Sequence, residues 1–185
     1  MAGVAIHSTE LVLGATKTSS PLRANIPFKT VNRRLSANYD PSLQRHHILP
    51  KQLLSYRYFG AMFDEIGRAN VGFDDFRSNG LLLPATESAT LRTGLPLHRG
   101  PHRRYNEIVI ERVGSVERRW AQVRLADPAA ALCEAIFRLT LLQSALRRRL
   151  LTEQRRFVLN RKDPLGTGFD FRELDAMAET LWRET

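Results

Sequence analysis

The sequence predicts an α+β fold, with a mixed centre followed by a C-terminal third that is mainly helical. Two short apolar segments, residues 44–49 and 80–84, are bounded by prolines or glycines, as is typical of buried strands. Apolar residues recur at helical spacing along residues 51–66, from 101 to about 124, and from 128 to 150. A length of 185 residues suits one domain, or one domain with a helical appendage.

The pattern changes twice along the chain and divides it into three expected regions. Residues 1–40 show little periodicity and cluster Ser, Thr, Pro and Asn, which predicts a loosely structured N-terminal arm with one short strand near residues 11–13. Residues 41–125 hold both strands, an inserted helix and the first long helix. Residues 126–185 are predicted to form a helical C-terminal extension.

Prolines and aspartates mark the expected helix starts. Pro101 lies where a helix would begin, because its missing N–H costs nothing at the first helical position. Asp127 and Pro128 are typical of an N-cap and a first-turn proline. A last amphipathic segment follows Asp170. These signals place the helical boundaries of the C-terminal half.

The charge of the chain is positive and almost entirely guanidinium. There are 28 Lys plus Arg against 19 Asp plus Glu, a formal charge of +9, and 24 of the cations are Arg. Arginine binds phosphate oxygens bidentately and stays charged at any working pH, so a nucleic-acid backbone is a natural partner. A basic surface kept for solubility, or for an acidic protein partner, is the alternative.

Cysteine usage and hydropathy exclude several classes. Cys133 is the only cysteine, which excludes an intrachain disulfide and a thiolate zinc site, and we expect it on the buried side of its helix. No apolar run approaches the roughly 18 residues that span a bilayer. The sequence has no basic segment followed by a continuous apolar stretch, so it does not support a secretory signal peptide. We therefore expect no membrane partner and a location that is either cytoplasmic or, after secretion, inside a target cell.

Four of the five histidines form two close pairs, His46-His47 and His98-x-x-x-His102. Neighbouring residues of a strand point to opposite faces, so His46 and His47 are expected to differ in role, one as a metal ligand and one as a base or hydrogen-bonding group. Because Pro101 interrupts a helix, we expect His98 in the preceding loop and His102 in the first helical turn. Exposed or structurally satisfied histidines are the alternative for each pair taken alone.

Three spaced motifs carry a resemblance to a known family. HHILP at 46–50, NGLLLP at 79–84 and HRGPHRRYN at 98–106 resemble the AHH family, which belongs to the HNH/endonuclease VII superfamily of ββα-metal (His-Me finger) nucleases. The resemblance covers roughly residues 45–113. Arg45 stands where the alanine of the family's name would be, so altered surroundings, but not lost chemistry, are expected there.

The resemblance implies a ββα-metal core, in which a hairpin and a helix clasp one divalent cation. By position, His46, His98 and His102 would be metal ligands, and Asn106 a reserve ligand. Mg²⁺ and Zn²⁺ are not distinguished. The absence of carboxylates from the motif leaves the ion's full charge facing a phosphate.

The resemblance also assigns the remaining polar residues. His47 would be the general base, and Asn79, in the turn of the hairpin, would orient it through local hydrogen bonds. An imidazole with a pKa of about 6.5 can take a proton from water at neutral pH. Apart from the resemblance, Arg99, Arg103 and Arg104 flank the expected ligands, and the following helix presents free backbone N–H groups, so both features are expected to attract phosphate. A solvated helix face is the alternative for Arg103 and Arg104.

The resulting hypothesis is a metal-dependent endonuclease that hydrolyses phosphodiester bonds with low sequence specificity, DNA being favoured over RNA. Many members of the resembled family are bacterial toxins, which implies delivery into a target cell and inhibition by an acidic immunity protein. A different class is a non-catalytic, zinc-stabilised module that binds nucleic acid. A third interpretation makes the helical C-terminal third a docking module for another protein.

Overall fold

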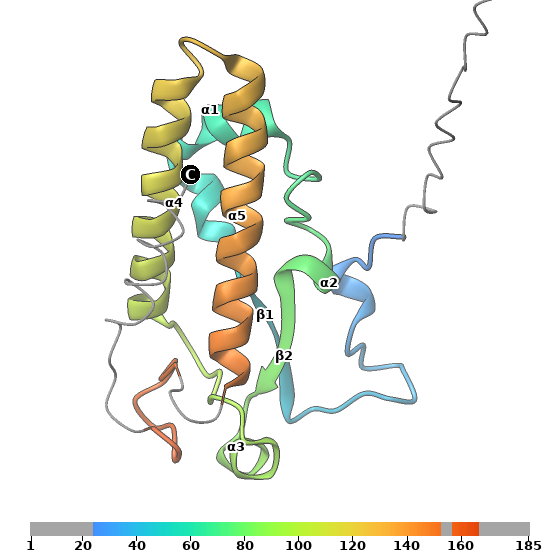
Figure 1. The fold of residues 1–185 in the computed structure, drawn as a ribbon. Coiled ribbons are helices and arrows are strands. Elements are labelled where there is room, and N and C mark those ends of the chain that lie inside the picture. The colour runs from blue at the N-terminus through green and yellow to red at the C-terminus, as the bar shows by residue number, and fades with distance from the viewer. Residues whose placement is uncertain (1–23, 153–156, 167–185) are drawn as a thin grey trace, which may run out of the picture.

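The structure, a computed structural model, describes residues 24–152 and 157–166 (Figure 1). The short strand expected near residues 11–13 and the amphipathic segment expected after Asp170 lie outside these ranges. Within them, a two-stranded antiparallel sheet lies beside two long helices, with shorter helices around it. The α+β fold, with its small strand pair and helical C-terminal part, is confirmed.

The sheet consists of β1 (Leu43–His47) and β2 (Gly80–Pro84), which pair in antiparallel register. His46 lies opposite Leu81, and His47 lies opposite Gly80. The first strand was expected at residues 44–49, but ladder pairing ends two residues earlier. Ile48 then donates its N–H to the Asn79 carbonyl over 2.8 Å, so the backbone remains tied to the start of β2.

A helical insertion joins the two strands. It comprises a 3₁₀ turn η2 (Lys51–Ser55), helix α1 (Arg57–Ile66) and one turn of helix α2 (Phe76–Asn79). The continuous helix predicted for residues 51–66 is therefore interrupted at Tyr56, whose backbone is extended (φ −82, ψ 118). The break allows Leu53 and the buried face of α1 to enter the core separately.

After β2 come helix α3 (Glu87–Thr93), helix α4 (Arg103–Val123) and helix α5 (Pro128–Leu151). The last two run antiparallel, side by side along the molecule (Figure 1). The predicted N-cap at Asp127 is confirmed, since its carboxylate accepts a hydrogen bond from the Ala130 N–H over 2.9 Å. The predicted end of α4 near residue 124 is also confirmed.

Helix α5 is attached directly to the start of β2. The Arg147 guanidinium donates to the carbonyls of Arg77 (2.6 Å) and Gly80 (3.1 Å). Its buried stripe runs through Ala131, Ala135, Leu139, Gln143, Leu146 and Leu150. Cys133 is exposed, contrary to expectation, because two residues advance the helix by about 200° and place Cys133 opposite Ala131.

Among the described helices, α5 is long and apolar enough by length and composition to cross a membrane, with a mean hydropathy of 1.4 over its most apolar window. The expectation of no spanning segment relied on uninterrupted apolar runs, which charged residues break here. Core helices meet the same criterion. The buried stripe of α5 packs on α4, and this single helix is weak evidence for a membrane.

Candidate metal centre and active site

Three histidines from separate parts of the chain converge on one point. The ligand nitrogens of His46, His98 and His102 all lie within 4.8 Å of one another. The ring of His46 lies 4.8 Å from that of His98 and 5.1 Å from that of His102, measured between centroids. Nitrogen atoms at these separations can bind a single ion. The structure thus brings His46 of the first pair together with both histidines of the second, whereas His47 is not in the cluster.

His46 forms the buried floor of this cluster. It lies on β1, is 2% exposed, and contacts the Tyr105 ring edge-on at 5.1 Å. The Tyr105 hydroxyl donates to the Ile48 carbonyl over 2.7 Å. This bond joins the first turn of α4 to the end of β1, and so sets the distance between His46 and the residues at the start of α4.

His98 is positioned by two segments that pair with its loop. Its backbone N–H donates to the carbonyl of Pro84, the last residue of β2, over 2.6 Å. The Asp163 carboxylate accepts from the Leu97 N–H over 2.8 Å, and Asn160 donates to the Arg99 carbonyl. The supporting role of residues 160–163 was not predicted, because only long-range hydrogen bonds reveal it.

Gly100 allows the chain to turn between His98 and His102. Its φ is +76, a left-handed conformation that glycine adopts without strain. The two imidazole rings consequently approach to 4.6 Å between centroids. Helix α4 begins at Arg103, not at Pro101, and His102 is its N-cap residue. The expectation that His102 lies in the first helical turn was wrong by one residue, because the backbone at His102 is not helical (φ −102, ψ 68).

The cluster has the chemistry of an ion site. His46 Nε2, His98 Nδ1 and His102 Nδ1 are buried and have no hydrogen-bond partner among the described residues. Burial lowers the pKa of His98 to about 4, with the nearby His102 as a smaller cause. Burial likewise lowers the pKa of His102, and lowers that of His46 well below its ordinary value. The imidazoles are therefore neutral at pH 7, and each of the three clustered rings has a nitrogen without a partner among the described residues. A divalent ion would satisfy all of them.

Asn106 lies one turn further along α4. Its Nδ2 donates to Gln52 Oε1 over 3.2 Å, and its Oδ1 is buried without a partner among the described residues. An orphaned amide oxygen on this helix is consistent with a reserve ligand, and that role stays a prediction.

His47 is half-buried, and its Nε2 also has no hydrogen-bond partner in the described part of the chain. It does not belong to the three-histidine cluster. Burial lowers its pKa to about 4, helped by the charges of Lys51 and Arg45 and opposed by Asp74. The ring is therefore neutral at pH 7, with the lone pair that a base requires.

The ring of His47 stacks on Phe28. The two rings are nearly parallel, 3° apart, with centroids separated by 3.7 Å. The ring of Phe76 contacts that of Phe28 edge-on, with 5.1 Å between the ring centroids. Sequence reasoning missed Phe28, because the residue falls in the region expected to be a loosely structured arm.

The backbone around Phe28 is held by long-range hydrogen bonds. Arg45 Nη1 donates to the Phe28 carbonyl over 2.8 Å. The Ile26 N–H donates to the Asp75 carboxylate over 2.9 Å, and the Ile26 carbonyl accepts from the Phe76 N–H over 2.7 Å. Arg45, which departs from the Ala-His-His pattern, thus anchors the residue that stacks on His47. That departure was the one signal that pointed to altered surroundings.

Asn79 is fully buried at the end of α2, just before β2. Its Nδ2 donates to the carbonyls of Leu49 (3.1 Å) and Phe73 (2.9 Å), while its Oδ1 accepts from the Leu49 N–H (2.7 Å) and from Gln143 (3.2 Å). The structure gives no hydrogen bond between its side chain and His47 in the described residues. Asn79 instead fixes the backbone that follows His47, so any effect on that ring is transmitted through the strand end.

The arginines around the cluster are solvent-exposed. Arg99 lies in the loop between the two histidines, and Arg103 and Arg104 form the first turn of α4. The N-cap residue His102 makes no side-chain capping hydrogen bond, and the N–H groups and positive dipole end of the helix lie next to it. These groups give the rim of the candidate site a positive potential.

The comparisons with known proteins agree with this geometry. A family described as AHH, a nuclease family of the HNH/ENDO VII superfamily with conserved AHH, matches residues 29–136, more than half of the chain. No curated protein and no solved structure matches. The matched range contains both strands, the first long helix and all the clustered histidines. The chain belongs to the AHH family of nucleases.

Proposed function

We propose that the protein is a metal-dependent endonuclease that hydrolyses phosphodiester bonds with low sequence specificity. The observation that carries the proposal is the pairing of functions at two adjacent residues of β1. His46 contributes one of the three orphaned imidazole nitrogens of the cluster, and His47 has an unpartnered Nε2 outside that cluster. One strand thus carries a candidate ion ligand and a candidate base at consecutive positions.

His46, His98 and His102 would hold one divalent ion. When bound, the ion supplies positive charge to the scissile phosphate and to the leaving oxygen. All three donors are neutral nitrogens, which suit Zn²⁺ and similar transition ions better than Mg²⁺, whose preferred ligands are oxygens. Three protein ligands leave a coordination position open for a substrate oxygen.

The residues of the chain perform the remaining steps. Nε2 of His47 removes the proton from the attacking water, and the Phe28 ring keeps the imidazole from rotating. Arg99, Arg103 and Arg104, with the N-terminus of α4, hold the phosphate groups on either side of the scissile bond. Contacts of this kind read the backbone and not the bases, which accounts for low sequence specificity.

A structural zinc site in a non-catalytic module is the competing proposal. Such sites are closed by four protein ligands, whereas three histidine nitrogens form the described cluster. In addition, Nε2 of His47 has no hydrogen-bond partner in the described residues. A base needs a nitrogen that is free in this way. Both observations favour the nuclease.

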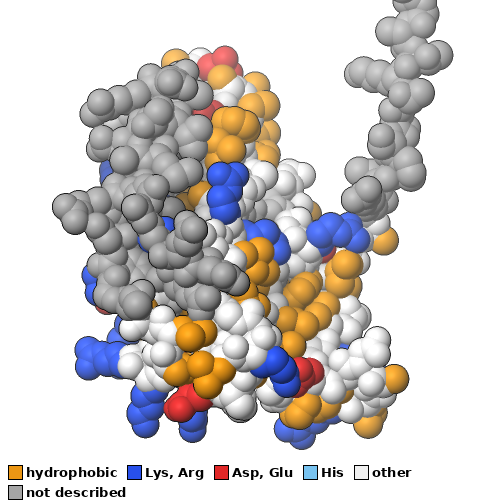
Figure 2. Space-filling view, turned by 60° about the horizontal axis from the view of Figure 1, so that its bottom comes forward, with side chains coloured by type: hydrophobic (Ala, Val, Ile, Leu, Met, Phe, Trp, Pro, Cys, Tyr) orange, Lys and Arg blue, Asp and Glu red, His pale blue; other side chains and the backbone are white. Residues whose placement is uncertain are grey.

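The biological setting is proposed from the family and the charge. A toxin that acts on the DNA of a target cell would need an inhibitor in the producing cell. The formal charge of +9 makes an acidic immunity protein the complementary partner. Lys and Arg side chains are spread over the described surface in the view of Figure 2, among apolar side chains.

Digestion of supercoiled plasmid and of structured RNA by the purified full chain tests the proposal. We expect nicking and linearisation of the plasmid, loss of activity with chelator, and recovery when Zn²⁺ or Mn²⁺ is restored. Substrates left intact under every divalent ion would contradict the endonuclease and favour the binding module. Faster cleavage of RNA would reverse the proposed substrate preference.

Replacing Phe28 by alanine tests how the base is positioned. Aromatic stacking contributes about 0.5–1.5 kcal/mol, so we expect the cleavage rate constant to fall roughly 2- to 10-fold. Ion affinity should not change, because Phe28 does not contact the cluster. Single-turnover cleavage and ion titration are the measurements. Phe28→Tyr, which keeps the stack, is the matched control and should retain the wild-type rate constant. Equal rate constants for Phe28→Ala and wild type would show that the stack does not position His47.

A further inference from the structure

A basic pocket lies beside β1, apart from the histidine cluster. Its volume is about 610 Å³. Four of its nine lining residues are cationic and none is acidic: Lys29, Arg33, Arg34 and Arg45. Tyr39 contributes an aromatic ring to the same lining. A concave surface with this composition attracts a polyanion.

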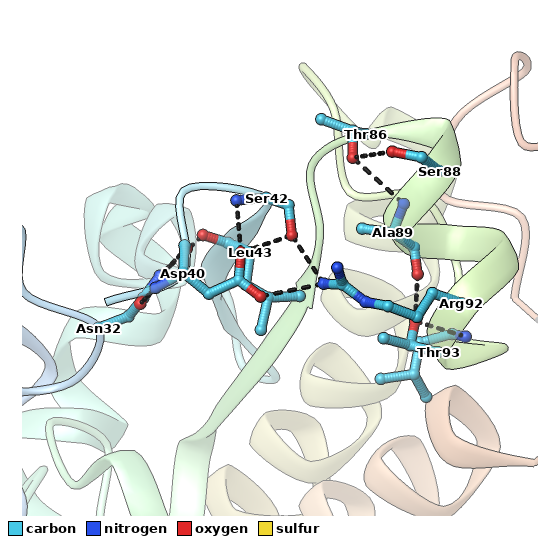
Figure 3. Close-up of polar contacts among 10 residues, drawn as sticks. Asn32, Asp40, Ser42, Leu43, Thr86, Ser88, Ala89, Arg92 and Thr93 are labelled. Atoms are coloured by element: carbon cyan, nitrogen blue, oxygen red, sulfur yellow. Dashed lines mark hydrogen bonds and ion pairs between the residues drawn. The ribbon is translucent and has the colours of Figure 1, made fainter. Parts of the chain in front are cut away.

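The wall of the pocket is a preformed loop. Asn32 has a left-handed backbone conformation, with a φ of +48, and its side chain forms hydrogen bonds with the backbone of Asp40, eight residues further on. Its Nδ2 donates to the carbonyls of Asp40 and Leu43, each over 2.9 Å, and its Oδ1 accepts from the Asp40 N–H over 2.8 Å (Figure 3). The loop that carries Arg33 and Arg34 is therefore closed at its base, and binding would not have to order it.

The adjacent acidic side chain is already engaged. Asp40 accepts from the Ser42 N–H (2.8 Å) and hydroxyl (2.5 Å), and forms an ion pair with Arg92 of α3 at 3.0 Å (Figure 3). These contacts, led by those of Ser42, keep its pKa below the ordinary value. Asp40 thus does not neutralise the pocket cations.

The pocket lies near the residue proposed as the base, although that residue does not line it. Arg45 precedes His47 by two strand positions, so both face the same side of β1, roughly 7 Å apart. Phe28 contacts both residues: its carbonyl accepts a hydrogen bond from Arg45, and its ring stacks on that of His47. Lys29, which lines the pocket, is the next residue in the chain. One short segment therefore borders both the pocket and the base.

We propose that this pocket binds the sugar–phosphate backbone of the nucleic-acid strand that flanks the scissile bond. The proposal rests on the endonuclease function argued above. The four cations would neutralise successive phosphates, and Tyr39 would stack on a base within the same strand. None of these contacts reads a base edge, so the site adds affinity without sequence preference.

Binding of a labelled phosphorothioate oligonucleotide by the full chain with Zn²⁺ tests the site, since this backbone keeps its charge and resists hydrolysis. The variant is Arg33→Gln with Arg34→Gln. The matched control is Arg57→Gln with Arg68→Gln, two exposed arginines, one at the start of α1 and one just after its end, that do not line the pocket. Fluorescence anisotropy at several salt concentrations gives both the affinity and its salt dependence.

We expect the pocket variant to bind on the order of tenfold more weakly at low salt, and its log–log salt slope to fall by about 1.4–1.8 for two lost phosphate contacts. The control should lose less of both, and Zn²⁺ affinity should be unchanged in each. A pocket variant that binds like the control, while wild type still cleaves DNA, would overturn the pocket and leave the endonuclease standing. A wild-type chain that neither binds nor cleaves would overturn both.

Inorganic phosphate at matched ionic strength separates a strand site from a single-anion site. If the pocket holds a strand, phosphate should displace little oligonucleotide, because it replaces only one of several contacts. Complete displacement at millimolar phosphate would show a single-anion site and overturn the proposal.

Discussion

Replacing His47 by alanine is expected to lower the cleavage rate constant by about 10²- to 10⁴-fold, the usual contribution of a general base, with no change in ion affinity. The reason is geometric. His47 follows a metal-ligand candidate in sequence, but its ring lies outside the three-histidine cluster and against Phe28. Single-turnover plasmid cleavage gives the rate constant, and calorimetric titration with Zn²⁺ gives the affinity.

The fold of this variant is checked by thermal unfolding. Loss of the stack on Phe28 should cost about 1 kcal/mol, which lowers Tm by roughly 2–4 °C in a chain of this size. A His47→Ala protein that loses its ion and unfolds would contradict the assignment of His47 as a base, and would favour a structural zinc site. Cleavage at the wild-type rate would place the base elsewhere.

Replacing His98 by alanine should weaken ion binding by more than about 100-fold, since changes to residues that merely support ligands already cost 10- to 100-fold. Cleavage should fall in parallel and recover in part at high ion concentration, which His47→Ala should not show. Titration of both variants with the same ion is the measurement. His98 is suited to this test because it lies in a loop, where alanine leaves the hydrogen bond from its N–H to Pro84 intact.

The same variant has a stability readout that does not depend on cleavage. An ion present at 100 times its Kd stabilises the native wild-type chain by about 2.7 kcal/mol. For a chain of this size, that shift corresponds to roughly 5–11 °C in Tm. His98→Ala should lose most of this gain. An equal rise in Tm for both proteins would mean that the ion binds elsewhere.

Local signals predicted the elements whose boundaries are set locally. The Asp127 N-cap and Pro128 placed the start of α5 correctly. The start of α4 was misplaced. The preference of proline for the first helical position predicted a start at Pro101, but the backbone is left-handed at Gly100 and still non-helical at His102, so the helix begins at Arg103. The long helix expected at residues 51–66 is interrupted at Tyr56, where the backbone is extended, although the apolar pattern runs on through this position.

The three-histidine cluster draws on the two spaced histidine pairs, which are visible in the sequence itself. The residues that hold those pairs are not visible in this way. Asn79 reaches Leu49 across 30 positions, and Tyr105 reaches Ile48 across 57. Contacts of such separation leave no periodic trace, so the expected bond from Asn79 to His47 was replaced by one to the neighbouring backbone.

The division into three regions stays a prediction, but contacts cross both of its boundaries. Phe28, from the arm, stacks on His47 of the centre. Gln143, from the C-terminal extension, donates to Asn79 over 3.2 Å and is buried there. The candidate site therefore draws support from all three regions, which composition alone did not indicate.

The central claim is that three imidazoles share one ion that keeps a position open for substrate. Crystals of the Zn²⁺-loaded full chain, examined by anomalous diffraction at the zinc edge, test it most directly. The account predicts one peak about 2.0–2.1 Å from His46 Nε2, His98 Nδ1 and His102 Nδ1, with solvent in the remaining position. A peak bound by His47, a site closed by a fourth protein ligand, or no ion between these rings would contradict it.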